Sequence, residues 1–259
     1  MPIYVTGDTH GTLDLLKFKY LDIDFQEDDY ILVLGDFAVC WDDNGNDAKV
    51  RDFWNQQKCK VLFLDGNHEN FDLLGRYSVS EKFGGKVQEI DDKITHLMRG
   101  QVYEIDGKTI FTMGGACSHD CGKNLEAIIN AHLDEFYTYD LAADFGKLPE
   151  SKRYYNRVPG RSWWPQEIPS ADEIAEGKAN LAARGNSVDY VLTHTPSLRF
   201  IRTLRLEEME YPWGVPLFDF LEWVEDNVHF NQWWFGHIHC DIERKGGTHR
   251  AFFYDFQSI

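Results

Sequence analysis

Short runs of hydrophobic residues recur along the chain, and each run ends abruptly at glycine or a polar residue. The runs are rich in β-branched and aromatic residues, which is typical of strands buried on both faces. We therefore predict strands over residues 3–6, 30–34, 61–64, 109–113, 190–193 and 232–235.

Between several of these predicted strands, apolar residues recur at helical spacing. This spacing predicts helices over 13–20, 47–57 and 216–227. Alternation of strand and helix indicates a layered α/β fold. Two tight-turn dipeptides also predict antiparallel hairpins within a mixed sheet. Asp106-Gly107 separates 102–105 from 108–111, and Gly246-Gly247 separates 241–244 from 250–256.

The stretch 116–186 does not follow this alternation of short strands and helices. It begins with a predicted helix over 125–136 and continues as an irregular piece rich in Tyr, Arg, Pro and Trp. A second helix should begin at Ser170, where Ser170 and Glu173 match a capping box, and end near Gly185. We expect an insertion across one face of the sheet, near the active site, within a single domain spanning 1–259.

Composition and charge indicate which kinds of binding partner and which cellular location to expect. The 259 residues carry a formal net charge of −17, and no basic stripe is visible, so a long nucleic acid is not expected as a partner. No apolar stretch approaches the ~20 residues of a membrane span, and no signal peptide is visible. The odd set of cysteines shows no disulfide framework, which favours a cytoplasmic location; they are Cys40, Cys59, Cys117, Cys121 and Cys240.

Polar motifs stand directly after the predicted strands, where the carboxyl ends of strands form a ligand crevice. These motifs are Gly7-Asp8-Thr9-His10-Gly11, Gly35-Asp36, Gly66-Asn67-His68-Glu69, Thr193-His194 and Gly236-His237-Ile238-His239. Carboxylate, imidazole and amide oxygen suit Mn, Fe or Zn. The candidate metal ligands are therefore Asp8, His10, Asp36, Asn67, His194, His237 and His239.

In order, residue type and spacing, these motifs resemble the calcineurin-like metallophosphoesterase superfamily over the whole span from Asp8 to His239. The resemblance implies an α/β/β/α fold, in which two mixed β-sheets pack as a sandwich flanked by helices. It implies that Asp8, His10 and His239 hold a first divalent ion and that Asn67, His194 and His237 hold a second. Asp36 would bridge the two ions.

Such a centre predicts hydrolysis of a phosphate ester, because a water shared by two cations loses its proton near neutral pH and can attack phosphorus. Manganese is the expected metal, with Fe or Zn as alternatives. His68, next to Asn67, is the candidate general acid. We expect a phosphodiester or a small nucleotide-like substrate.

The second motif departs from the pattern of the phosphoprotein phosphatases, which carry Gly-Asp-x-Val-Asp-Arg-Gly there. This chain has Phe37 to Asp43 after Asp36, so the phosphate-binding Arg and the Asp that orients the catalytic His are both missing. Asp42 or Asp43 is a candidate for orienting His68, and Trp41 offers an apolar wall. A serine/threonine-type protein phosphatase and a catalytically silent metal-binding scaffold remain as alternative functions.

Three segments resemble a subgroup of bacterial and phage metallophosphoesterases: Gly35-Asp36-Phe37 followed by Trp41, Gly114-Gly115-Ala116-x-Ser118-x-Asp120, and Ser162-Trp163-Trp164-Pro165-x-Glu167. One arginine guanidinium can bind phosphate oxygens through two parallel hydrogen bonds, and a tryptophan ring can stack on a base or exclude water. The candidate substrate-binding residues are therefore Trp41, His119, Asp120, Arg161 and Trp164. The alternative for Trp163 and Trp164 is ordinary packing of the second helix of the insertion.

Overall fold

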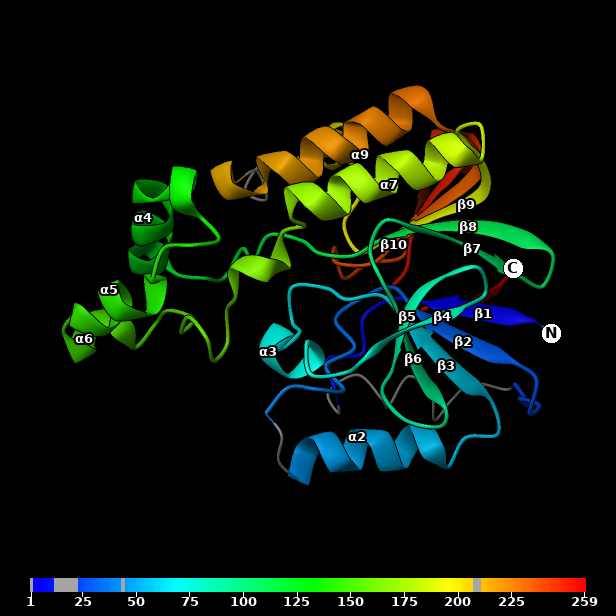
Figure 1. The fold of residues 1–259 in the computed structure, drawn as a ribbon, viewed down its shortest axis with the longest axis horizontal. Coiled ribbons are helices and arrows are strands. Elements are labelled where there is room, and N and C mark those ends of the chain that lie inside the picture. Colours follow the sequence, from blue (N-terminus) through cyan, green and yellow to red (C-terminus); the bar gives the residue numbers. More distant parts are fainter. Residues whose placement is uncertain (1, 12–22, 43–44, 207–210) are drawn as a thin grey trace.

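The computed structural model describes residues 2–11, 23–42, 45–206 and 211–259. Within these ranges, two mixed β-sheets pack face to face, and helices cover both outer faces (Figure 1). This arrangement confirms the α/β/β/α fold predicted from the sequence. The helix predicted over 13–20 lies outside the described residues.

The first sheet contains, among the described residues, seven strands in the order β13-β1-β2-β3-β6-β5-β4. Strands β1, β2, β3 and β6 run parallel, and β13, β5 and β4 pair antiparallel with their neighbours. Their bounds are β1 Ile3–Thr6, β2 Tyr30–Val33, β3 Lys60–Phe63, β4 Val79–Lys82, β5 Gly85–Glu89, β6 Ile94–Leu97 and β13 Gln257–Ser258.

The second sheet has six strands in the described part of the chain, in the order β11-β12-β10-β9-β8-β7. Its inner strands β12, β10, β9 and β8 run parallel, and β11 and β7 close the two edges antiparallel. Their bounds are β7 Gln101–Ile105, β8 Lys108–Met113, β9 Ser187–Thr193, β10 His229–Phe235, β11 Ile242–Arg244 and β12 His249–Ala251.

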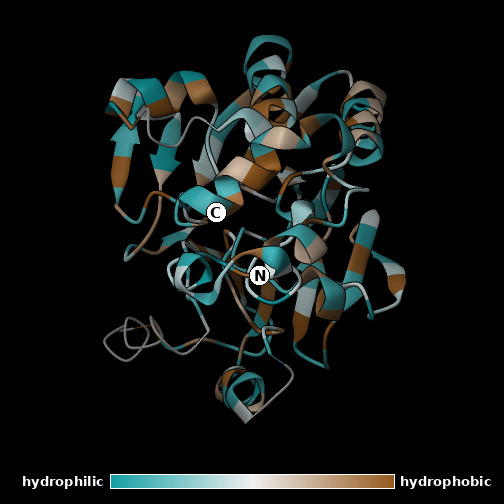
Figure 2. Cartoon of the chain, turned by 90° about the vertical axis from the view of Figure 1, so that its left-hand side faces the viewer, coloured by the Kyte–Doolittle hydropathy of each residue, from teal (hydrophilic) through white to brown (hydrophobic). Residues whose placement is uncertain are grey.

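Burial on both faces explains why the strand segments are continuously hydrophobic. In β2, Tyr30 and Leu32 belong to the core between the sheets, whereas Ile31 and Val33 belong to the core under the outer helices. Alternate residues of a strand point to opposite faces, so both sets must be apolar. On that outer face, helix α2 (Gly45–Asn55) buries Trp54. The helices carry both hydrophobic and hydrophilic residues (Figure 2).

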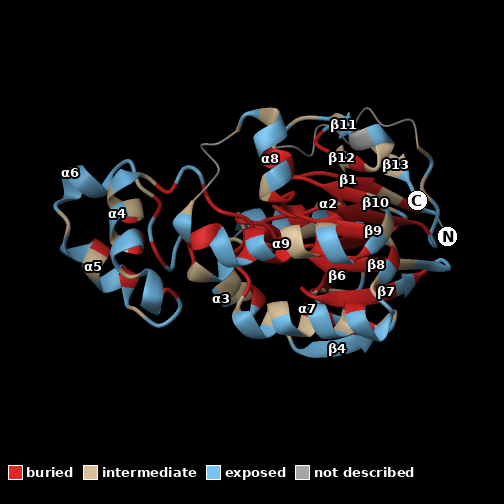
Figure 3. Cartoon of the chain, turned by 90° about the horizontal axis from the view of Figure 1, so that it is seen from above, coloured by how far each residue is buried: buried red, intermediate tan, exposed pale blue. Residues whose placement is uncertain are grey.

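Helices α7 (Ala171–Ala183) and α9 (Val215–Asn227) cover the outer face of the second sheet, with α8 (Leu198–Leu204) beside α9. The other part of segment 116–186 lies beyond the strand ends. There, α4 (Lys123–Ala131), α5 (Leu141–Lys147) and α6 (Glu150–Arg153) form an outlying group (Figure 3). Leu125 and Phe145 of this group still belong to the same hydrophobic cluster as the second sheet.

Helix ends inside this segment follow local hydrogen bonding. The predicted helix over 125–136 ends at Ala131, because His132 leaves the helical conformation (φ −131°) before a short 3-10 turn, η1 (Leu133–Glu135). The capping box of α7 is confirmed, since Ser170 and Glu173 exchange side-chain to backbone hydrogen bonds. Gly185 follows that helix with φ of 64°, as expected of a C-terminal stop.

Both predicted hairpins form, but the second is shorter than expected. Strand β12 ends at Ala251, whereas the pattern predicted a strand to residue 256. The reason is a competing acceptor: the backbone N–H groups of Phe253, Tyr254 and Asp255 donate to the Asp241 carboxylate at 2.8–3.1 Å. Strands β4, β5, β6 and β13 were not predicted from the sequence. Within the described residues, no helix is both long and apolar enough to cross a membrane.

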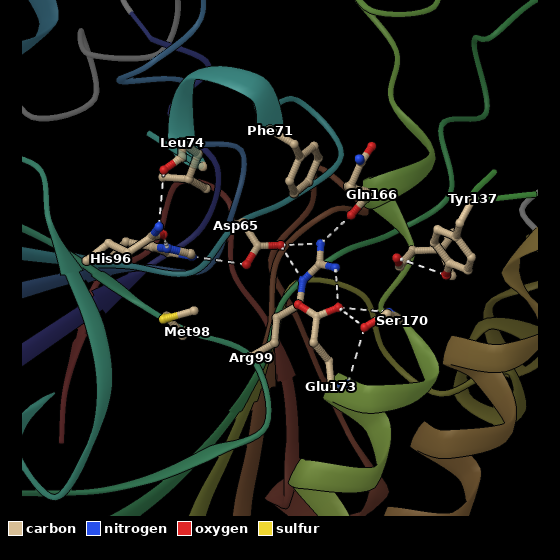
Figure 4. Close-up of a pocket in the computed structure, with 13 residues that line it drawn as sticks. Asp65, Phe71, Leu74, His96, Met98, Arg99, Tyr137, Gln166, Ser170 and Glu173 are labelled. Carbon is tan, nitrogen blue, oxygen red and sulfur yellow. Dashed lines mark hydrogen bonds and ion pairs between the residues drawn. The ribbon is translucent and has the colours of Figure 1, made fainter. Parts of the chain in front are cut away.

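A buried ion pair joins the first sheet to the insertion (Figure 4). Arg99 donates to Asp65 Oδ2 from Nε at 2.8 Å and to the Gln166 carbonyl from Nη2 at 2.8 Å. His96 Nε2 lies 3.0 Å from the other oxygen of Asp65. Asp65 and Arg99 are 1% and 6% exposed, so each is the main compensation for the charge of the other.

We predict that Arg99→Met lowers the free energy of unfolding by about 3–5 kcal/mol, because it leaves the buried Asp65 carboxylate without its arginine partner. The matched control is Arg184→Met, which breaks the pair Arg184–Glu104, whose side chains are 40% and 56% exposed. An exposed pair contributes about 0–1 kcal/mol. Urea unfolding of both variants gives the comparison, and similar losses would contradict the assignment.

Candidate metal centre

The predicted ligand residues lie in loops after the carboxyl ends of parallel strands, and both sheets contribute. The loops after β1, β2 and β3 carry Asp8, His10, Asp36 and Asn67, and those after β9 and β10 carry His194, His237 and His239. Face-to-face packing of the sheets brings the two sets of loops to the same end of the sandwich. All these residues are buried except His10, which is half-buried, and His239, which is exposed.

Several of these loop residues have unusual backbone conformations. Positive φ angles occur at four ligand residues that are not glycine: His10 (46°), Asp36 (49°), His237 (66°) and His239 (48°). Such conformations cost of order 1–3 kcal/mol each and persist only where the surrounding structure imposes them. Two glycines allow close approach: a Cβ at Gly35 would collide with the His194 ring, and one at Gly66 with the Asp36 carboxylate.

The first ligand group consists of Asp8, His10, Asp36 and His239, whose ligand atoms all lie within 4.8 Å of one another. His239 Nε2 is 3.0 Å from Asp8 Oδ2, and His10 Nε2 is 3.4 Å from Asp36 Oδ2. The second oxygen of Asp8 accepts a hydrogen bond from the His237 backbone N–H at 3.0 Å, which fixes the carboxylate.

The second ligand group consists of Asp36, His194 and His237, again within 4.8 Å of one another. Asn67 adds an amide oxygen, because its Oδ1 lies 3.3 Å from His194 Nε2. His194 Nδ1 donates to the Leu34 carbonyl at 2.7 Å, which leaves Nε2 as the ligand atom. Asp36 belongs to both groups.

Buried negative charge dominates the electrostatics of this site. Burial raises the pKa of Asp36, but the charges of His194 and His68 outweigh burial and hold that pKa well below its usual value. Burial lowers the pKa of His194, while the Asp36 carboxylate raises it, to about 9. A proton on His194 thus balances part of the carboxylate charge here, and a divalent cation would take the place of that proton. The donor set fits such a cation.

Glu69 holds the loop that carries Asp36. Its Oε1 accepts a hydrogen bond from the Phe37 N–H at 2.8 Å, and its Oε2 accepts one from the Ala38 N–H at 3.2 Å. Its role was not predicted from the sequence. The structure shows a buried acidic side chain that fixes the backbone next to a ligand.

His68 lies beside the ligand groups, and its backbone N–H donates to Asp36 Oδ1 at 2.7 Å. Arg157 Nη2 is 2.6 Å from His68 Nε2 and 2.9 Å from Asp120 Oδ2. Arg157 is only 8% exposed. Burial, the largest effect, lowers the pKa of His68. The Asp36 carboxylate raises this pKa and the Arg157 guanidinium lowers it, and the net value is about 4. His68 Nε2 is therefore placed as an acceptor of the guanidinium N–H.

The arginine at this position differs from the one expected. Arg161 is exposed and lines a separate groove with Arg153 and Tyr154, so in the described part of the chain it lies apart from the ligand residues. Arg157, four positions earlier, reaches His68 instead. Asp120 connects to His68 through Arg157. Asp42 lines the same pocket as His68, and Asp43 lies outside the described residues.

A pocket of about 370 Å³ opens beside the ligand groups, and its wall includes His10, His68, Trp41 and Val50. The Trp41 ring centroid is 6.2 Å from that of His68 and 5.9 Å from that of Trp164. Trp41 therefore forms an aromatic surface next to the centre, and the buried Trp164 supports it from behind.

His119 also lies near the centre, since its ring centroid is 6.3 Å from that of His237. Of the substrate residues expected from the sequence, the structure thus brings Trp41, His119, Asp120 and Trp164 close to the ligand groups or to His68. Arg161 is the one that it does not bring there.

A family model for calcineurin-like phosphoesterases matches residues 1–241 of the chain. Among solved structures, a phosphopantetheinyl hydrolase from Mycobacterium tuberculosis is 14% identical, with a TM-score of 0.41, over 98% of this chain and 89% of that one. A candidate 5′-nucleotidase from Staphylococcus aureus is 12% identical, with a TM-score of 0.40, over 97% of this chain and 48% of that one. No curated protein matches.

We predict that Asp36→Asn weakens Mn²⁺ binding at both ligand groups, because an amide offers one neutral oxygen where the carboxylate offers two charged ones. His10→Ala should weaken mainly one ion, since His10 belongs to the first ligand group only. Isothermal titration with Mn²⁺ and elemental analysis give the affinities and the stoichiometry.

The matched control for this experiment is Asp189→Asn. Asp189 is also hydrogen-bonded, to Thr109 at 2.9 Å, but it lies outside both ligand groups. Two ions bound to Asp36→Asn with unchanged affinity would show that Asp36 is not a shared ligand.

Proposed function

This chain belongs to the calcineurin-like phosphoesterase family, a family of metal-dependent hydrolases, and we propose that it hydrolyses a small phosphate ester with two divalent metal ions. Manganese is the metal we expect, with iron and zinc as alternatives. The expected substrate is a phosphodiester or a small nucleotide-like ester. We further propose that the chain is a single domain, in which segment 116–186 supplies part of the active site.

The observation that carries this proposal is the sharing of Asp36 by two groups of ligand atoms. One carboxylate within 4.8 Å of both an Asp8–His10–His239 set and a His194–His237 set is the arrangement that two adjacent cations require. A single structural ion would need only one of these sets. We assign Asn67 to the second set, because its amide oxygen faces His194.

Two bound cations would supply a water that deprotonates near neutral pH and positive charge to offset that of the phosphoryl group. The side chains of the protein supply the remaining steps. His68 lies on the pocket side of the ligand groups, where it can give a proton to the departing oxygen.

Arg157 is a suitable partner for a phosphate oxygen, because it brings a buried guanidinium to the edge of an acidic site. In the structure Nε and Nη2 pair with Asp120, Nη2 also donates to His68 Nε2, and Nη1 donates to the Ser162 and Asn67 carbonyls. If the guanidinium turned to a phosphate oxygen, it would release His68 Nε2, which could then take up a proton from solvent and pass it to the departing oxygen. Arg157 would thereby fill the role first assigned to Arg161.

The pocket favours a small substrate with a flat, uncharged leaving group. Its volume of about 370 Å³ is at the low end for small-molecule sites. Trp41 offers a ring on which such a group can stack, and Asp42 and Asp47 add acidic character to the wall. Together with the net charge of −17, this disfavours a long nucleic acid.

The test is a panel of substrates with the manganese-loaded protein: bis- and mono-p-nitrophenyl phosphate, cyclic nucleotides, dinucleotides and a phosphopeptide. We expect hydrolysis of diesters or small nucleotides. Hydrolysis of the phosphopeptide alone would favour a protein phosphatase. Metal binding without hydrolysis of any ester would favour a catalytically silent scaffold.

We predict that His68→Ala retains both metal ions but lowers kcat by about 10²–10⁴-fold for esters with a poor leaving group. The loss should be smaller for p-nitrophenyl esters, because nitrophenolate departs without a proton. Steady-state kinetics with the two kinds of ester measures the difference. Equal losses would exclude His68 as the proton donor.

We predict that Arg157→Ala weakens competitive inhibition by inorganic phosphate at least about 10-fold, since a charged hydrogen bond contributes about 1.5–3 kcal/mol. The matched comparison is Arg161→Ala, an exposed arginine in the same segment, which should change the inhibition constant less than about 2-fold. The reverse ranking of the two variants would return the phosphate-binding role to Arg161.

A further inference from the structure

Two sequence motifs are not explained by the ligand groups alone, and the structure brings them together. One motif, 114–120, follows β8, and the other, 162–167, ends in the short 3-10 turn η2 (Pro165–Glu167). Ser118 of the first and Glu167 of the second are both 0% exposed. Two polar side chains without access to solvent need partners, and they are partners of each other.

The contacts form a chain that ends at a proposed metal ligand. Glu167 Oε1 accepts hydrogen bonds from the Ser118 backbone N–H at 3.1 Å and from Trp163 Nε1 at 2.9 Å. The Ser118 hydroxyl donates to Glu167 Oε2 at 2.6 Å. Asn67 Nδ2 then donates to Ser118 Oγ at 3.3 Å, and Asn67 Oδ1 faces His194 Nε2 at 3.3 Å.

We propose that Glu167 and Ser118 are positioning residues that fix the amide orientation of Asn67 and so set the affinity of the second ligand group for its metal ion. This inference rests on the proposed function, because it takes Asn67 as a ligand. A hydroxyl has one proton, and the proton of Ser118 goes to Glu167. Its oxygen is left to accept, so the NH₂ of Asn67 must face it.

The consequence for a metal ion is direct. With its NH₂ held by Ser118, Asn67 presents its oxygen toward His194. The opposite orientation would present the NH₂, which has no lone pair to offer a cation. Outer hydrogen-bond partners of this kind typically change metal affinity by 10–100-fold when they are removed. Trp163 and the Ser118 backbone hold Glu167 itself in place.

The substitution Glu167→Gln tests the direction of these bonds without changing shape. The glutamine oxygen would keep the two bonds at the Oε1 position, and its NH₂ would stand where Oε2 accepted from Ser118. That NH₂ donates to the Ser118 oxygen, so the hydroxyl proton turns toward Asn67 and no longer selects the productive orientation. Ser118→Ala removes the same selection by deleting the hydroxyl.

The experiment titrates Mn²⁺ into the full chain and each variant by calorimetry. Burial raises the pKa of Glu167 to about 7, so the titration runs at about pH 8, where the carboxylate is ionised. Both variants should bind one ion 10–100-fold more weakly and the other within about 3-fold of the unmodified chain. Ser197→Ala is the matched control, because it breaks another serine–glutamate bond, Ser197–Glu225 at 2.7 Å, which is partly buried.

A double-substitution cycle adds a readout that a merely structural role would not move. Asn67→Asp has two equivalent oxygens, so its orientation no longer matters. Ser118→Ala should therefore cost little affinity in the Asn67→Asp background and 10–100-fold in the natural one. Equal effects in both backgrounds would overturn the proposal.

The outcomes separate this inference from the proposed function. An unmodified chain that binds no Mn²⁺ refutes the proposed function. Two ions bound normally by the unmodified chain and by Glu167→Gln refute only the positioning role. A loss shared equally by both ions also refutes it. If Ser118→Ala does not fold, Glu167→Gln decides, since it preserves volume and the contact with Trp163.

Discussion

The buried carboxylate of Asp36 is the constraint around which the site is arranged. An ionised group that is 1% exposed is tolerated only when opposite charge or hydrogen bonds compensate it. Here His10 comes from the first sheet and His194 from the second, and both imidazoles lie within 3.4 Å of the carboxylate. The packing of two sheets is thus what lets a single acidic side chain serve two sets of ligands.

That convergence determines the backbone around it. Asp36 has a left-handed backbone conformation. At Gly35 and Gly66, neighbouring side chains lie so close that a Cβ would collide with them. Such geometry is unfavourable locally and must be imposed by its surroundings. The strands before the loops supply the rigidity, because β2 and β3 are buried on both faces. Glu69 adds a second restraint by binding the backbone after Asp36.

Much of this arrangement was predictable because it depends on short-range patterns. Strands buried on both faces are hydrophobic runs, and the polar motifs follow them directly. Their order and spacing gave the seven candidate ligand residues and the family resemblance that implied the fold. Strand β4 was not predicted, because it is not a hydrophobic run. It is a mostly exposed edge strand with the sequence Val79-Ser-Glu-Lys82. Its pairing with β5 comes from tertiary packing, which composition does not record. The same holds for the end of β12, where Asp241 captures the backbone.

The substrate side of the site was less predictable for a physical reason. Segment 116–186 has few periodic patterns, and its contacts with the ligand loops depend on which side chain turns inward. Arg157 and Arg161 are equivalent by sequence, yet Arg157 is buried against His68 and Arg161 is exposed. Ser118 and Glu167 likewise lie far apart in sequence and meet only through folding. The loops of the sandwich therefore bring the candidate metal ligands together, and in our proposal the insertion supplies the groups that orient them.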